Sequence, residues 1–158
     1  MFYREAGPKN APVVLLLHGF PSSSRMFRNL IPLLSDTYRV IAPDYPGFGH
    51  SGVPDPASFS YTFDGLADIV DHLLDQLDVD RFTLYMMDFG APVGFRLALK
   101  HPERVSAIVM QNAPLYPKLR RDGGRRSGST GTLAPPSTGT PHAPTSARRR
   151  REHSTYSA

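Results

Sequence analysis

An aspartate at a strand-to-helix turn is the residue of this chain best suited to do chemistry. The apolar run Phe82–Met87 is typical of a strand and ends at Asp88, and Gly90 opens a helical pattern two positions later. A sharp turn of this kind presents its central side chain at the carboxyl edge of a sheet. Backbone amides at the helix N-terminus stabilise negative charge there. The pattern therefore predicts that Asp88 is a carboxylate nucleophile that attacks carbon.

Strands and helices must alternate to position this turn, and the sequence shows that alternation. Apolar runs predict strands, and apolar residues spaced three and four apart predict helices. The predicted strands span residues 13–17, 38–42, 81–87 and 105–110, and the predicted helices span residues 22–35, 63–77 and 92–100. This order predicts an α/β fold with a mostly parallel sheet and flanking helices. Three loops, 18–21, 43–52 and 88–91, should then meet at the carboxyl ends of the strands.

Three motifs in these loops together resemble the α/β-hydrolase superfamily. They are His-Gly-Phe-Pro at 18–21, Asp-Tyr-Pro-Gly-Phe-Gly-His-Ser at 44–51, and Met-Met-Asp-Phe-Gly at 86–90. The match is closest to the epoxide hydrolase and haloalkane dehalogenase branch, whose turn carries Asp where esterases carry Ser. The resemblance covers residues 1 to about 116. It implies that the chain begins within the second strand of the family's sheet.

The resemblance implies a reaction for Asp88. The carboxylate would open an epoxide or displace a halide to form an alkyl-enzyme ester, and a histidine-activated water would hydrolyse that ester. The backbone amides of Phe20 and Phe89 would hold the oxyanion. No cofactor and no metal is implied, and the substrate would be a small, apolar electrophile.

Two alternatives to an epoxide hydrolase remain. Dehalogenases of the branch usually hold the halide with Asn or Trp after the first His-Gly and with Trp after the nucleophile. This chain has Phe20 and Phe89 there, without a polar hydrogen, which favours the epoxide hydrolase over a haloalkane or fluoroacetate-type dehalogenase. The other alternative is a non-catalytic fragment whose basic tail binds nucleic acid nonspecifically, for which no groove-reading helix is evident. Met86 lies two residues before Asp88, at a position where many members of the family carry a smaller residue.

Other polar residues receive structural interpretations. His18 is predicted to shape its loop, and Asp44 to hold a structural turn. The three remaining histidines of the first 117 residues have no predicted catalytic role: His50, His72 and His101. The aspartates at 64, 68, 71 and 75 follow the apolar stripe of one helix and are interpreted as its solvated face.

The chain divides by composition near residue 117. Residues 1–117 carry nine Lys/Arg and twelve Asp/Glu, whereas residues 118–158 carry nine basic and two acidic residues. Of these last 41 residues, 21 are Gly, Pro, Ser or Thr, so little burial would offset the entropy cost of ordering them. We predict a partial hydrolase core over 1–117 and a disordered tail over 118–158. The tail is rich in residues that GC-rich codons encode, which favours a shifted reading frame in a GC-rich gene. Translation of the DNA in the other two frames would test this hypothesis.

Several parts of the family's site are not recognisable in this sequence. They are the lid helices, the supporting acid and the general-base histidine, and no predicted element would hold His142 or His153 as substitutes. We therefore expect poor activity and an uncovered sheet edge prone to self-association. The chain has no cysteine and its longest apolar run is too short to span a bilayer. A cytoplasmic protein without membrane contact is the expectation.

Overall fold

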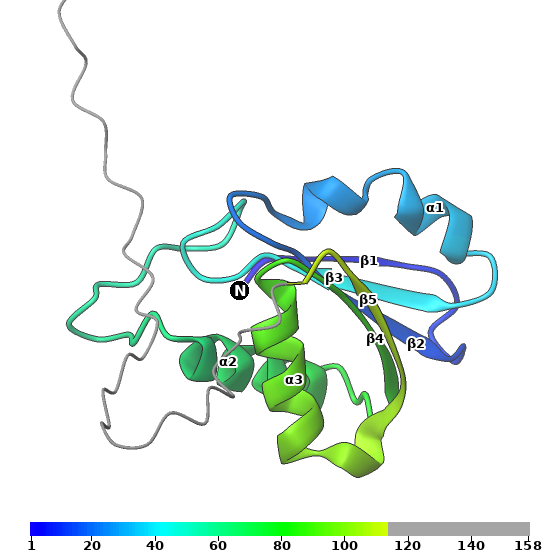
Figure 1. The fold of residues 1–158 in the computed structure, drawn as a ribbon. Coiled ribbons are helices and arrows are strands. Elements are labelled where there is room, and N and C mark those ends of the chain that lie inside the picture. The colour runs from blue at the N-terminus through cyan, green and yellow to red at the C-terminus, as the bar shows by residue number, and fades with distance from the viewer. Residues whose placement is uncertain (114–158) are drawn as a thin grey trace, which may run out of the picture.

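Five strands form one mixed sheet in the computed structural model, which describes residues 1–113 (Figure 1). The strands are β1 (Tyr3–Ala6), β2 (Val13–Leu17), β3 (Arg39–Pro43), β4 (Phe82–Met87) and β5 (Val105–Gln111). Their spatial order is β1-β3-β2-β4-β5. Only β1, at one edge, runs antiparallel to its neighbour, and the other three pairings are parallel. The predicted α/β class with a mostly parallel sheet is confirmed.

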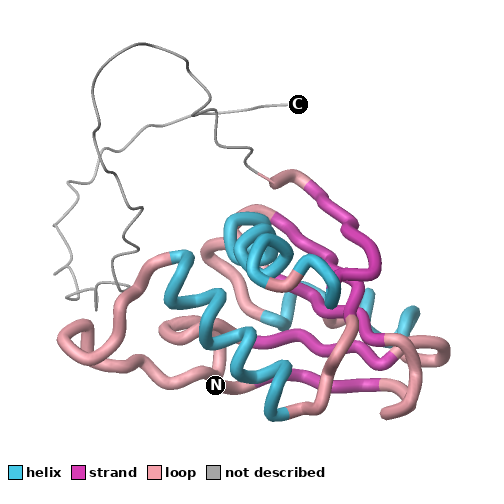
Figure 2. Tube along the Cα trace, turned by 90° about the horizontal axis from the view of Figure 1, so that it is seen from below, coloured by secondary structure: helices cyan, strands magenta, loops and turns pink. Residues whose placement is uncertain are grey.

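Helices cover both faces of this sheet (Figures 1 and 2). The helical segments are the 3₁₀ turn η1 (Ser24–Phe27), α1 (Leu30–Leu34), α2 (Phe63–Gln76), α3 (Gly90–Lys100) and the 3₁₀ turn η2 (Pro102–Arg104). The short segments η1 and α1 lie on one face, and the longer α2 and α3 lie side by side on the other. None of the helices within residues 1–113 is long and apolar enough to span a bilayer.

The alternation of side chains along the central strands explains why both faces are covered. Leu15 and Leu17 of β2 point into the core shared with α2 and α3, whereas Val14 and Leu16 point toward η1 and α1. All four side chains are at least nine-tenths buried. A strand buried on both faces reads as a continuous apolar run, which is why residues 13–17 were predictable as a central parallel strand.

The helix predicted over residues 22–35 is wrong in its extent. The structure has instead two short pieces, η1 and α1, separated by Arg28 and Asn29. Ser23 accepts a hydrogen bond from the Arg25 amide and so starts the 3₁₀ turn. Pro32 has no amide to continue a longer helix through this point, and it is tolerated because it lies in the first turn of α1.

The solvated acidic face predicted for α2 is correct except at Asp71. Asp71 is 6% exposed and accepts hydrogen bonds from His101 and Arg104, at 3.0 and 3.1 Å. Lys100 also lies 3.0 Å from its carboxylate. A buried carboxylate requires compensating donors. Asp71 takes these donors from the end of α3 and from η2, and it thereby joins both elements to α2.

The strand β5 is the second edge of the described sheet. It pairs with β4 along its length, and within residues 1–113 it has no other strand neighbour. Three consecutive apolar side chains on it are roughly half exposed: Ile108, Val109 and Met110. An apolar edge without charged residues is a surface on which strands of other molecules can pair. Self-association at this edge therefore stays a prediction. The tail over 118–158, with His142 and His153, lies outside the described residues.

Candidate active site

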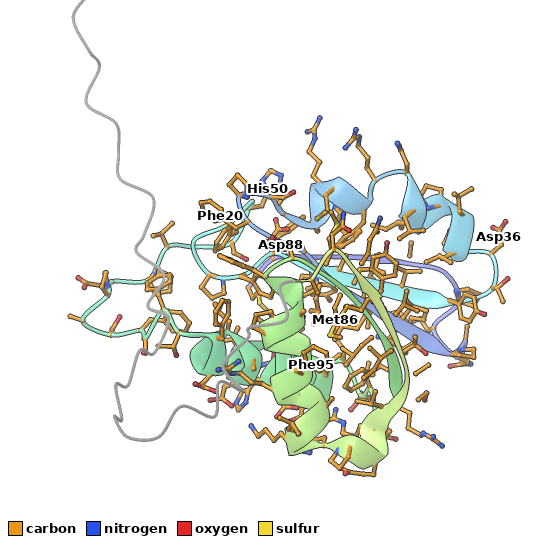
Figure 3. All side chains as sticks on the ribbon, in the orientation of Figure 1. Phe20, Asp36, His50, Met86, Asp88 and Phe95 are labelled. Atoms are coloured by element: carbon orange, nitrogen blue, oxygen red, sulfur yellow. The ribbon has the colours of Figure 1, made fainter. Side chains whose placement is uncertain are left out.

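The three motif loops meet at one end of the sheet. They follow β2, β3 and β4, whose carboxyl ends lie together because these strands are parallel. Phe20, His50 and Asp88 accordingly lie near one another, whereas Asp36 lies at the far side of the molecule (Figure 3). The sheet thus gathers chemistry-bearing loops that are about 70 residues apart in sequence.

Asp88 occupies a sharp, left-handed turn between β4 and α3. Its φ is 49°, in the left-handed region that residues other than Gly, Asn and Asp seldom adopt. The amide of Ala91 donates to the Asp88 carbonyl at 3.1 Å and closes the turn. The side chain is directed at the loop after β2, where the Phe20 amide donates to Oδ1 at 3.0 Å. One carboxylate oxygen is therefore held by a backbone donor.

Two glycines let the backbones approach closely enough for this contact. A Cβ at Gly19 would overlap the Asp88 side chain, and a Cβ at Gly90 would overlap the backbone carbonyl of Leu17. Both positions require the absence of a side chain. The glycines of the first and third motifs thus allow β2 and the turn after β4 to pack against each other.

The two predicted oxyanion donors differ in their present contacts. The Phe20 amide lies on the Asp88 carboxylate, whereas within residues 1–113 the Phe89 amide makes no hydrogen bond with that carboxylate. Phe89 is the residue that precedes α3, and its ring lies 5.8 Å from that of Phe20. The structure therefore brings the Phe20 amide to the Asp88 carboxylate and places the rings of Phe20 and Phe89 next to each other.

His18 connects two of the loops from a fully buried position. Its Nε2 accepts from the Tyr45 amide at 3.3 Å, so its proton lies on Nδ1, which donates to the Gly19 carbonyl at 2.9 Å. Burial lowers the pKa of His18, and the Gly19 carbonyl and the Asp44 carboxylate offset this only in part. A neutral ring with both nitrogens engaged matches the loop-shaping role predicted for His18.

The buried neutral His18 predicts an acid-sensitive fold. Its folded pKa lies below the ordinary value of about 6.5, so below that pH the unfolded chain binds more protons than the folded one. The free energy of unfolding should therefore fall as the pH drops from 7 toward 5. Denaturant titrations across this range should show a flatter pH dependence for His18→Gln. His72→Gln, at an exposed position, should keep the original slope, and an unchanged slope in His18→Gln would contradict the assignment.

Asp44 holds the loop after β3 in place. The carboxylate is fully buried and accepts from the Ser24 amide at 2.6 Å and from the His50 amide at 2.9 Å. Burial raises the pKa of this carboxyl, but the donors outweigh burial, so the pKa lies below its ordinary value. All its described contacts are structural, as predicted for Asp44.

The remaining histidines make contacts other than with the Asp88 carboxylate, including His50, which lies near it. The ring of His50 packs against Phe2 at 5.0 Å, His72 is exposed on α2, and His101 binds Asp71. Within residues 1–113, none of them hydrogen-bonds to Asp88, and no group of three acidic or histidine side chains there could hold a metal ion.

One contributor to the site was missed from the sequence. Phe48 lies in the irregular loop after β3, and its ring packs edge-on against Phe20 with centroids 6.2 Å apart. The loop has no periodicity that would indicate which of its side chains turns inward. Only its position between the two glycines of the second motif marked it as unusual.

The large Met86 is accommodated by a glycine on α3. Met86 is fully buried, and a Cβ at Gly94 would overlap its sulfur and lie 2.8 Å from its Cγ. Gly94→Ala should therefore lower the free energy of unfolding by about 1–3 kcal/mol. The same change in a Met86→Ala background should cost clearly less, because the space is then free. Gly52→Ala, where a Cβ has no neighbour within 4 Å, is the control, and equal costs in both backgrounds would refute the pairing.

Comparison with known proteins identifies the fold family. A family model described as alpha/beta hydrolase fold matches residues 12–157. The chain belongs to the α/β-hydrolase fold family. The resemblance stated from the three motifs is thereby confirmed.

Two curated relatives each match about seven tenths of the chain. It is 52% identical over 116 residues to an uncharacterised hydrolase, YNR064C, of Saccharomyces cerevisiae, covering 73% of this chain and 39% of that protein. It is 40% identical over 114 residues to a haloalkane dehalogenase of Psychrobacter cryohalolentis, covering 72% of this chain and 37% of that protein.

A solved structure is also similar to the chain over part of its own length. It comes from a set of epoxide hydrolases of the superfamily found in metagenomes from hot environments, and it is 38% identical with a TM-score of 0.65. The match covers 71% of this chain and 38% of that one. The chain thus spans about two fifths of the length of the relatives that it matches.

Proposed function

We propose that this α/β-hydrolase opens epoxides through Asp88, with an alkyl-enzyme ester as the intermediate. The observation that carries the proposal is the left-handed turn of Asp88 together with the Phe20 amide, which lies 3.0 Å from Oδ1. Because the Phe20 amide donates to Oδ1, we assign Oδ2 as the oxygen that attacks carbon. A carboxylate in such a turn is a nucleophile for carbon.

Ring opening forms one bond at the epoxide carbon and breaks another. Oδ2 of Asp88 forms a bond to an epoxide carbon, the bond from that carbon to the ring oxygen breaks, and the alkoxide takes a proton from water. Oδ1 becomes the carbonyl oxygen of the ester. It already accepts the Phe20 amide proton, and the Phe89 amide at the start of α3 is proposed as the second donor when water attacks this ester.

The side chains beside Asp88 favour an epoxide over a haloalkane. A departing halide needs hydrogen-bond donors for its charge, and the rings of Phe20 and Phe89 offer none. A dehalogenase is the second candidate because a curated relative that is 40% identical has that activity in its name. Within residues 1–113 no histidine hydrogen-bonds to Asp88, so we expect the alkyl-enzyme ester to accumulate rather than turn over.

Intact-protein mass spectrometry separates these candidates. An epoxide adds its whole mass to the chain, because no group leaves. A haloalkane adds its mass less one hydrogen halide. We expect stoichiometric labelling by a terminal epoxide and none by the matched alkyl bromide. Labelling by the bromide alone would favour the dehalogenase. The absence of labelling by both, without diol formation, would refute the proposed function.

A further inference from the structure

We propose that Phe20, Phe48 and Phe89 form an aromatic wall that selects a neutral, aryl-substituted epoxide as the substrate. This inference rests on the proposed function, since it concerns what is presented to Asp88. The wall is defined by these three rings. Phe20 is its centre, with its ring 6.2 Å from that of Phe48 and 5.8 Å from that of Phe89.

The exposure of Phe20 is the first reason for the inference. Its side chain is 58% exposed although its own amide binds the Asp88 carboxylate. Exposing most of a phenyl ring forgoes the favourable burial of its apolar surface. The Phe20 ring therefore offers an apolar surface beside Asp88, where a ligand can cover it (Figure 3).

The support behind the wall is the second reason. The Phe89 ring rests edge-on against Phe63 of α2 at 5.5 Å, and Phe63 is buried. The Phe48 ring rests against the buried His18 at 5.5 Å and the buried Tyr45 at 6.2 Å. Both neighbours of Phe20 are thus fixed by core residues, and the wall is preorganised before a ligand arrives.

The geometry and the charge of the wall define the ligand. Phe20 stands at 87° to Phe48 and at 36° to Phe89, angles that provide both an edge and a tilted face to a further ring. Edge-to-face and offset contacts between aromatic rings are more favourable than burial of the same area alone, and a saturated ring does not make this additional gain. Within residues 1–113 the arginines that stack on rings lie over Phe2, Phe63 and Phe82 and not over the wall, and the Asp88 carboxylate repels anions. A neutral epoxide that carries an aryl group within reach of the wall, on the epoxide carbon or one carbon away, fits these features.

A matched pair of epoxides tests the selectivity. Benzyl oxirane and cyclohexylmethyl oxirane have similar size and differ in aromaticity, and neither places its ring on the epoxide carbon. For each epoxide, the rate of ester formation on the protein is divided by the rate of its reaction with acetate in solution. This normalised rate should be roughly 10-fold higher for the benzyl compound than for the cyclohexylmethyl compound. Phe48→Leu and Phe20→Leu should reduce this ratio to roughly 2-fold or less. Phe95→Leu, on α3 away from the turn, is the control and should keep it.

Binding to the Asp88→Asn variant gives an independent readout. The diols of the same two epoxides, followed by NMR titration, should bind with the same preference for the aryl compound, lost again in Phe48→Leu. Ester formation at equal normalised rates, with equal diol binding, would overturn the aromatic wall and leave the proposed function intact. The absence of an ester from both epoxides, with selective diol binding, would refute the proposed function alone.

Discussion

Asp88→Asn is expected to lower the rate of ester formation from a terminal epoxide by at least about 10³-fold, as removal of a catalytic nucleophile does in other hydrolases. A neutral amide is a poor nucleophile for carbon. The turn itself should persist, because asparagine tolerates the positive φ of 49° at this position. Its amide oxygen can also accept the Phe20 amide proton that Oδ1 accepts now.

Two controls keep this result specific. Asp36→Asn removes a charge at an exposed position on the far side of the molecule. This variant should be labelled by the epoxide at the rate of the parent protein. The midpoint of thermal unfolding should be close to that of the parent for both variants. Labelling of the Asp88→Asn variant at the parent rate would show that another group is alkylated.

Asp44→Ala is expected to lower the free energy of unfolding by about 3–5 kcal/mol, the range for breaking a buried, hydrogen-bonded charge. The change leaves the buried amide of Ser24 without its acceptor and frees the loop at His50. Loss of these bonds detaches η1 from the loop after β3. Denaturant unfolding followed by circular dichroism measures the change.

The pH dependence gives this prediction a second check. The pKa of Asp44 is depressed in the folded chain, so its stabilisation is present above the ordinary aspartate range near pH 4 and is lost as the pH falls further. The difference in the free energy of unfolding between the parent and Asp44→Ala should therefore shrink below about pH 4. Asp36→Ala should change stability by less than about 0.5 kcal/mol. Equal effects at the two positions would contradict the anchoring role.

The regular elements that carry the site were predictable from the sequence. The strand Val13–Leu17 was predicted with its observed bounds. The bounds of the helix Phe63–Gln76 and of the strand Phe82–Met87 were predicted to within one residue. These segments are long or strongly periodic, so burial of their apolar faces decides their structure. The helix predicted over 22–35 failed because serine caps and a proline divide a segment with little apolar periodicity.

The side-chain arrangement of the site was less predictable. The three motifs indicated that Phe20 and Asp88 meet, since loops after parallel strands share one edge. The packing of Phe48 on Phe20, the bond between His18 and the Tyr45 amide, and the burial of Asp71 depend on loop conformation and on charges from other elements. Such contacts join residues that no local pattern relates, and only the folded chain shows them.

Peptide mapping of the epoxide-treated chain by tandem mass spectrometry tests the central claim most directly. The label should form an ester on Asp88, in the segment between β4 and α3, and mild alkali should release it as the diol. Labelling of His50, or of another carboxylate such as Asp36 at equal yield, would contradict the assignment of Asp88 as the nucleophile.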